Sequence, residues 1–187
     1  MKRGSIGLSV NILVVVIISL VILGLGVNLL YQFIGGATEI QGHLDQRTEE
    51  ELEHLLTDQG KRVALPLHTA NVLPGESHTF GIGILNIGEE KQDYFIAIDE
   101  VNYIDEDGTV KEFPQGVLDE WILYNNQELN VEPADNRKEP ILVSVPENAP
   151  RGQYIFKAKV CTSRPVKQDC TQNSQYGNTQ QFTVVIQ

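Results

Sequence analysis

The chain has 187 residues, of which 41% are hydrophobic, and its formal net charge is −11. This acidic balance argues against nucleic-acid binding, which normally requires a basic surface, and against docking on anionic lipid head groups. The length accommodates one ordinary domain and a connector beside the apolar segment described next.

The first feature along the chain is an apolar segment, because no charged side chain occurs between Arg3 and Glu39. Ile, Leu and Val dominate this segment from Val10 to Leu30. A bilayer core about 30 Å thick needs roughly 20 apolar residues of helix. We therefore predict a cytoplasmic stub and a single transmembrane helix over residues 1–37, with the lipid bilayer as partner.

The distribution of charge predicts how this helix is oriented. Lys2 and Arg3 precede the apolar segment, whereas the remainder of the chain carries a net charge of −13. Positive residues are enriched on the cytoplasmic side of membrane helices. We therefore expect the N-terminus in the cytoplasm and the C-terminal domain outside the cell membrane.

Three small or polar residues recur at four-residue spacing within the apolar segment: Gly24, Asn28 and Gln32. One interpretation is that they are isolated positions, with Gln32 close to the membrane interface. The other is that they form one face against another helix, since small and polar residues promote helix association in membranes. In that case the partners are copies of this chain or other envelope proteins.

Residues 38–62 follow a helical pattern, and we predict an acidic amphipathic stalk helix there. Apolar side chains and one Thr recur at steps of three and four residues, which places them on one face: Leu44, Thr48, Leu52, Leu55 and Leu56. Gly60 stands where a helix end is expected. The apolar face has two candidate partners, the protein's own domain or a second copy of the helix.

From residue 63 to 187 the pattern changes to short strands separated by turns. Phe80, Ile82 and Ile84 alternate with other residues and so share one face of a strand. Seven or eight such strands with few helical patterns predict an all-β antiparallel sandwich. The two cysteines, Cys161 and Cys170, both lie in this domain, and an oxidising compartment would permit a disulfide between them.

A search for catalytic or metal-binding motifs finds no nucleophile elbow, phosphate-binding loop or dinucleotide fingerprint. Gly81-Ile-Gly83 lacks the third glycine of such a fingerprint, and residues 105–108 are better explained as an Asp-Gly turn than as a calcium loop. The histidines have no metal-binding spacing: His43, His54, His68 and His78. We predict no catalytic residue, no cofactor and no metal. For an exposed binding patch, the residues to inspect are Trp121, Tyr124 and Tyr176.

Two segments resemble known families. Residues Lys2 to Ser9, with the sequence KRGSIGLS, resemble the class III signal of archaeal pilins and archaellins. The resemblance implies cleavage between Gly4 and Ser5, and an apolar helix packed in a filament core with a sandwich outside. Ser9 stands where many type IV pilins carry an acidic residue.

The second resemblance covers about 120 residues. The turn Leu73-Pro-Gly75, the run that ends at Gly88, and the segment VPENAPRGQY from Val145 to Tyr154 resemble immunoglobulin-like domains of archaeal and bacterial surface proteins. This resemblance implies an immunoglobulin-like fold in which Tyr154 packs at a sandwich corner. The order of parts also resembles that of single-pass archaeal membrane proteins.

Together these features predict a non-enzymatic, membrane-anchored cell-surface protein with a structural or adhesive role at the envelope. One alternative is a pilin-like or archaellin-like subunit of an extracellular filament, processed after Gly4. A second alternative is an envelope ligand-binding module or enzyme.

Overall fold

The computed structural model describes residues 14–20, 44–114, 116–171 and 173–187. It divides into two units, residues 1–42 and residues 43–187. In the first unit residues 14–20 are helical. The described part of the chain includes no helix with the length and apolar character needed to span a membrane.

Two sets of predicted residues lie outside the described ranges. They are the cleavage site formed by Gly4 and Ser5 and the helix face formed by Gly24, Asn28 and Gln32. Within the described helix, the Ser19 hydroxyl donates a hydrogen bond to the carbonyl of Val15 at 2.8 Å.

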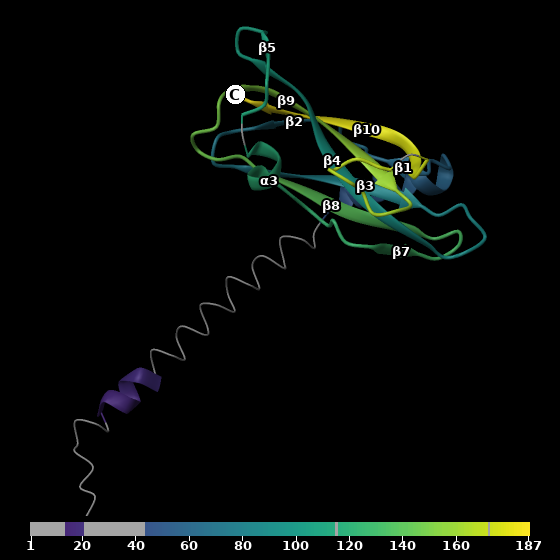
Figure 1. Cartoon of the computed structure of the whole chain (residues 1–187), viewed down its shortest axis with the longest axis horizontal. Helices are drawn as coiled ribbons and strands as arrows, with labels where there is room; N and C mark the ends of the chain where they lie inside the picture. Colours follow the sequence, from purple (N-terminus) through teal and green to yellow (C-terminus); the bar gives the residue numbers. More distant parts are fainter. Residues whose placement is uncertain (1–13, 21–43, 115, 172) are drawn as a thin grey trace, which may run out of the picture. The chain divides into compact units, whose positions relative to one another are not determined.

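The second unit is a sandwich of two β-sheets (Figure 1), which confirms the predicted fold class for this part of the chain. The first sheet contains, in spatial order, β1 (Val63–Ala64), β3 (Ser77–Leu85), β8 (Asn136–Ser144) and β6 (Ile122–Tyr124). The second contains β2 (Thr69–Val72), β10 (Gln175–Ile186), β9 (Gly152–Cys161), β4 (Gln92–Asp105) and β5 (Val110–Lys111), with β7 (Leu129–Val131) paired to β4.

This strand order is that of an immunoglobulin-like sandwich, in which strands A, B, E and D face strands G, F and C. The first strand is divided between the sheets: β1 pairs with β3, and β2 pairs with β10. The β2–β10 pair is parallel, so the expectation of a purely antiparallel sandwich is wrong at this edge. A short helix that the sequence analysis did not predict, α3 (Val117–Trp121), precedes β6.

The core lies between the two sheets and follows the predicted alternation. Phe80, Ile82 and Ile84 of β3 are completely buried. From the opposite sheet, Phe156 and Phe182 pack face to face with ring centroids 5.2 Å apart. Burial of these side chains is the main favourable term for folding.

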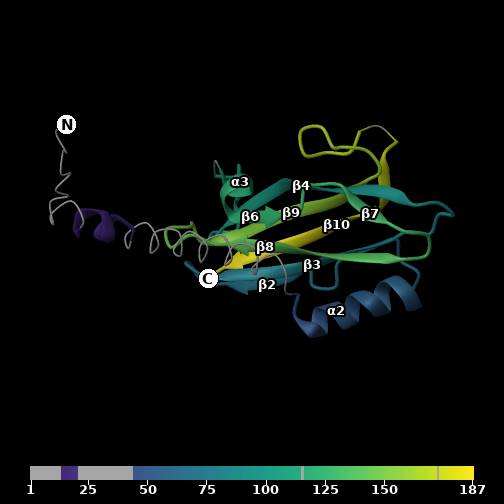
Figure 2. The same cartoon turned by 90° about the horizontal axis from the view of Figure 1, so that it is seen from below.

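The amphipathic segment forms helix α2 (Gln46–Glu53), followed by one π-helical turn, η1 (His54–Asp58). The helix lies on the outer face of β3 (Figure 2). Leu52 and Leu56 are completely buried there. Of the two candidate partners for its apolar face, the protein's own sandwich therefore occupies it.

Tyr154 lies at the start of β9 and is completely buried. Its hydroxyl donates a hydrogen bond to the carbonyl of Pro150 at 2.8 Å, which is the geometry of the tyrosine corner in immunoglobulin-like domains. Its ring stacks on Tyr103 with centroids 4.6 Å apart and contacts Trp121 at 4.9 Å.

Candidate functional site

The loop between β9 and β10 is closed by a disulfide between Cys161, the last residue of β9, and Cys170. The two Cα atoms are 5.4 Å apart. The predicted disulfide is therefore present. Because both cysteines belong to one hairpin, the bridge fixes the shape of the loop rather than joining the two sheets.

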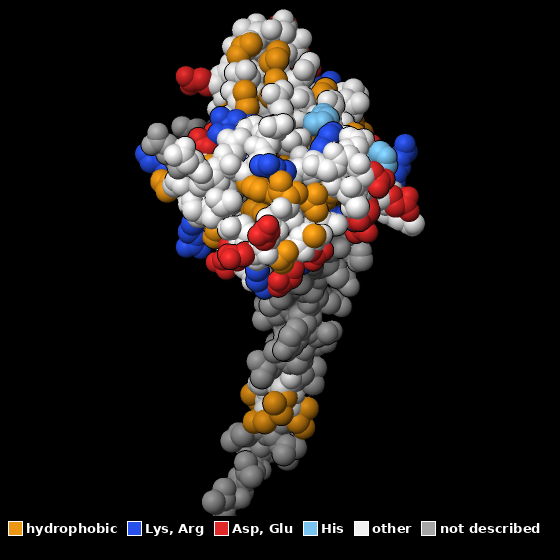
Figure 3. Space-filling model, turned by 90° about the vertical axis from the view of Figure 1, so that its right-hand side faces the viewer, with side chains coloured by type: hydrophobic (Ala, Val, Ile, Leu, Met, Phe, Trp, Pro, Cys, Tyr) orange, Lys and Arg blue, Asp and Glu red, His pale blue; other side chains and the backbone are white. Residues whose placement is uncertain are grey.

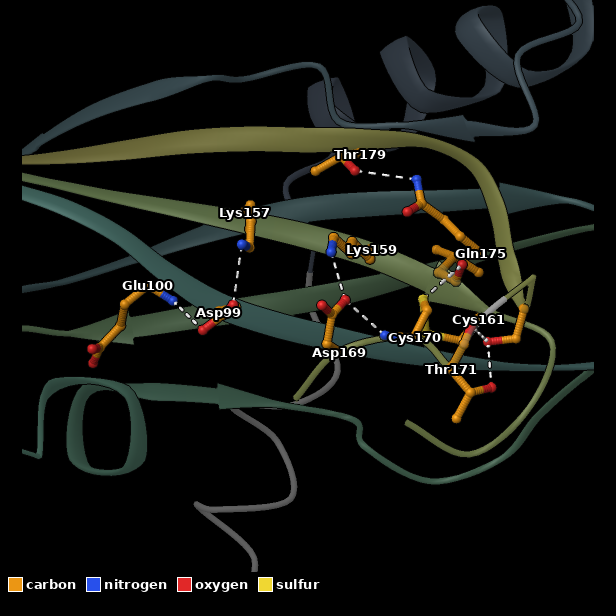
Figure 4. A network of polar contacts seen from close by, with 12 residues as sticks. Asp99, Glu100, Lys157, Lys159, Cys161, Asp169, Cys170, Thr171, Gln175 and Thr179 are labelled. Carbon is orange, nitrogen blue, oxygen red and sulfur yellow. Dashed lines mark hydrogen bonds and ion pairs between the residues drawn. A yellow bond between two sulfur atoms is a disulfide. The ribbon is translucent and has the colours of Figure 1, made fainter. Parts of the chain in front are cut away.

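A network of polar contacts holds the same loop against the sheet (Figure 4). The ammonium group of Lys159 on β9 pairs with Asp169, which also accepts a hydrogen bond from the Cys170 backbone N–H at 2.8 Å. The hydrogen bond from Lys159 lowers the pKa of Asp169 below its usual value. The Thr162 N–H donates to the carbonyl of Ser174 at 2.7 Å and closes the base of the loop.

The loop forms one wall of a cleft of about 450 Å³. The opposite wall comes from α3, β6 and the residues that follow β6. Apolar side chains that line the cleft are Ile96, Leu118, Ile122, Leu123 and Pro165, and polar ones are Asp119, Tyr124, Asn126, Gln127, Arg164 and Gln168. Polar residues outnumber apolar ones in this lining, so the cleft offers hydrogen-bonding groups together with apolar contact surface.

Strand β6 lies at the edge of its sheet, where it pairs with β8. Leu123 on this strand is 46% exposed, and Val166 on the disulfide-linked loop is 62% exposed. Exposed apolar side chains beside an open strand edge suit contact with another chain. The cleft is therefore the candidate contact site of the domain.

The three aromatic residues singled out from the sequence have different positions. Trp121 belongs to the core and is 6% exposed. Tyr124 lines the cleft, and burial raises the pKa of its hydroxyl. Tyr176 is half-buried, and its hydroxyl donates to the carbonyl of Leu85 at 2.7 Å. Of the three, only Tyr124 contributes to the cleft.

The described histidines lie on different elements. His54 is on η1, and a nitrogen of the His68 ring lies 2.8 Å from the carbonyl of Gln181. His78 on β3 packs its ring edge against Phe80, and burial lowers its pKa. Among the described residues no group of three His, Cys, Asp or Glu side chains is arranged to hold a metal ion.

The acidic segment at residues 105–108 forms a turn. Asp105 accepts hydrogen bonds from the N–H groups of Thr109 at 2.8 Å and Asp107 at 3.1 Å. Lys111 pairs with the same carboxylate and lowers its pKa. These contacts account for the conformation that the sequence predicted as an Asp-Gly turn.

Comparison with known proteins finds no matching family profile and no matching curated sequence. Among solved structures, the chain is similar to the ASH/PapD-like domain 7 of human CEP192, with 16% identity and a TM-score of 0.45 over 68% of this chain and 86% of that chain. It is also similar to a family 123 glycoside hydrolase from Clostridium perfringens, with 14% identity and a TM-score of 0.43 over 75% of this chain and 25% of that chain.

A third similar structure is the class 5 fimbriae chaperone CfaA, with 13% identity and a TM-score of 0.37 over 65% of this chain and 54% of that chain. All three likenesses are too distant to identify a ligand or an activity.

Proposed function

We propose that this chain is a non-enzymatic, single-pass membrane protein whose immunoglobulin-like sandwich has a structural or adhesive role outside the cell membrane. The observation that carries the proposal is the packing of α2 on β3. Leu52 and Leu56 are completely buried against the sheet, so the helix nearest to the apolar segment in the sequence belongs to the sandwich. A load applied at that helix is therefore transmitted to the sheet through packed side chains.

Two further features support a location outside the membrane. Lys2 and Arg3 precede the apolar segment, which favours a cytoplasmic N-terminus. The disulfide between Cys161 and Cys170 favours an oxidising compartment for the sandwich. For an adhesive role, the cleft beside the disulfide-linked loop supplies the contact surface.

Fractionation and labelling of intact cells that express the full-length chain would test this proposal. We expect the protein to stay with the membrane after alkaline washing and to require detergent for extraction. After reduction, a membrane-impermeant thiol reagent should label Cys161 and Cys170 without cell lysis. A full-length chain that is freely soluble and monomeric without detergent would contradict the proposal.

A pilin-like or archaellin-like filament subunit is the second candidate. It is favoured by the resemblance of residues 2–9 to the class III signal, together with a helix packed on a β-domain. Mass spectrometry of protein isolated from its native cells distinguishes the candidates. A mature chain that begins at Ser5, with filaments visible by electron microscopy, supports this second function, whereas an intact Met1 excludes processing.

A further inference from the structure

A second hollow, separate from the cleft, lies between the end of η1 and the start of β10. Its volume is about 700 Å³. One side is formed by Gly60, Lys61, Arg62 and Val63, and the other by Gln175, Gly177, Asn178, Thr179 and Gln180. The end of the sandwich that carries the β9–β10 loop faces the viewer in Figure 3, where basic side chains lie among acidic and uncharged ones.

The charge of this hollow differs from that of the chain as a whole. The chain carries a net −11, yet the lining contains Lys61 and Arg62 and no acidic residue. Most other lysines and arginines of the sandwich pair with a carboxylate, as Lys159 does with Asp169. Among the described residues Lys61 and Arg62 have no such ion pair, which leaves both charges available to an anion.

The guanidinium group of Arg62 is positioned by an aromatic ring. It lies 5.8 Å from the ring centroid of Tyr176, an arrangement that favours a cation over an aromatic face. The Tyr176 hydroxyl is fixed by its hydrogen bond to Leu85. A guanidinium held in this way presents a planar pair of donors that matches a carboxylate.

The opposite side of the hollow offers hydrogen-bond acceptors. The pairing of β10 with β9 shifts register between Tyr176 and Gln180, and residues 177–179, where the regular pairing is interrupted, line the hollow. The amide nitrogen of Gln175 donates to Gly177 at 3.3 Å and Thr179 at 3.2 Å, the latter contact drawn in Figure 4. The amide nitrogen of Gln180 donates to Asn178 at 3.2 Å. Among the described residues neither amide oxygen accepts a hydrogen bond, so both can accept from hydroxyl groups.

We propose that this hollow binds an acidic saccharide, with the carboxylate on Lys61 and Arg62 and sugar hydroxyls on the amide oxygens of Gln175 and Gln180. A sulfate or phosphate ion would pair with the two cations but would donate few hydrogen bonds to the amide oxygens. A neutral sugar would use the oxygens and leave the charges unpaired. A uronic-acid chain carries a carboxylate and free hydroxyl groups on each sugar ring, so the hollow adds a saccharide site to the contact surface that the proposed adhesive role has in the cleft.

Calorimetric titration of the full-length protein in neutral detergent micelles would test the site. The probes are trigalacturonic acid, the neutral trisaccharide maltotriose and sodium sulfate. We expect saturable binding of trigalacturonic acid only, and about tenfold weaker binding after Lys61→Gln together with Arg62→Gln, since charge-assisted hydrogen bonds are lost. Gln180→Leu should weaken the binding of trigalacturonic acid without creating affinity for sulfate.

The matched control is Arg47→Gln together with Lys167→Gln, which removes the same charge from exposed positions outside both the hollow and the cleft and should leave affinity unchanged. If both double variants weaken binding of trigalacturonic acid equally, the net charge of the protein alone attracts the ligand, and the proposed site is wrong. Equal affinity for sulfate, or no binding of trigalacturonic acid, would overturn it as well. Thermal unfolding of each variant checks that the fold is kept.

Failure of this test is distinguishable from failure of the proposed function. Loss of saccharide binding would leave the membrane association of the chain untouched, and that association is measured separately by cell fractionation. Conversely, a soluble chain that still bound trigalacturonic acid would keep the site and exclude the anchored role.

Discussion

Gly83 of β3 lies directly beneath Leu56 of η1, so closely that a Cβ atom at position 83 would stand 2.7 Å from Leu56 Cδ1. Gly81, two residues earlier on the same face, has the same relationship to Thr48 at 2.8 Å. The inward residue between them, Ile82, is completely buried in the core. In this Gly-Ile-Gly sequence, Ile82 fills the core on one face of β3, and the two glycines leave room for the helix on the other face.

The first prediction concerns this contact. Gly83→Ala should lower the free energy of unfolding by about 1–3 kcal/mol, because the added methyl group forces Leu56 out of its position. Leu56→Ala alone should cost about 2–5 kcal/mol through the cavity it leaves. Urea denaturation monitored by circular dichroism measures both values.

The double variant is the control for this mechanism. If the methyl group at position 83 clashes with Leu56, the combined loss should be clearly smaller than the sum of the single losses. Additive losses would show that Gly83 is required for a reason other than its contact with Leu56.

The second prediction concerns the disulfide. Replacing Cys161 and Cys170 together with Ala should lower stability by roughly 2–3 kcal/mol, as expected for a short closed loop. The same substitution should free the wall of the cleft that carries Arg164, and faster amide hydrogen exchange over residues 162–174 would report this. Denaturation of the unmodified protein with and without reductant should reproduce the difference, while the double variant should not respond to reductant.

The sandwich could be predicted from the sequence because alternation of buried and exposed residues encodes a strand directly. Phe80, Ile82 and Ile84 are consecutive members of that alternation, and all three are buried. The disulfide could also be predicted from the sequence, since Cys161 and Cys170 are the only two cysteines in the chain.

The binding surfaces could not be predicted, because they join residues that are distant in sequence. Arg164 and Leu118 line the same cleft, and Arg62 and Gln180 line the same hollow. Each pair is brought together only by the order of the strands in the folded sheets. Helix α3 was missed because five residues are too few to show a helical period. Gly81 and Gly83 were compared with a nucleotide-binding motif, whereas their role is close packing against a helix.

The third prediction concerns Glu100 on β4. Burial raises the pKa of its carboxyl above the usual value of 4.5, with Asp99 and Asp119 adding to the shift. A raised pKa means that the folded state disfavours the charged form, so this residue favours folding below pH 4.5 and loses that contribution as the pH rises through the folded-state value.

Glu100→Gln should therefore stabilise the protein at pH 7 and have little effect at about pH 3, where the carboxyl is protonated in both states. Chemical denaturation at the two pH values measures the difference. Glu112→Gln, at an exposed position after β5, is the matched control and should change stability little at either pH. Destabilisation by Glu100→Gln at pH 7 would contradict the assignment.

The fourth prediction concerns the turn before β9, which two tyrosine hydroxyls hold at consecutive carbonyl groups. Tyr154 donates to the carbonyl of Pro150 at 2.8 Å, and Tyr103 donates to that of Arg151 at 2.9 Å. Replacing either tyrosine with Phe removes one hydrogen bond and keeps the ring packing, so each variant should lose about 1 kcal/mol. Because both bonds restrain one turn, the double variant should lose at least the sum of the two, and thermal unfolding measures all three. If Tyr154→Phe leaves the stability unchanged, the ring contacts of Tyr154 with Tyr103 and Trp121, rather than its hydroxyl, define this corner of the sandwich.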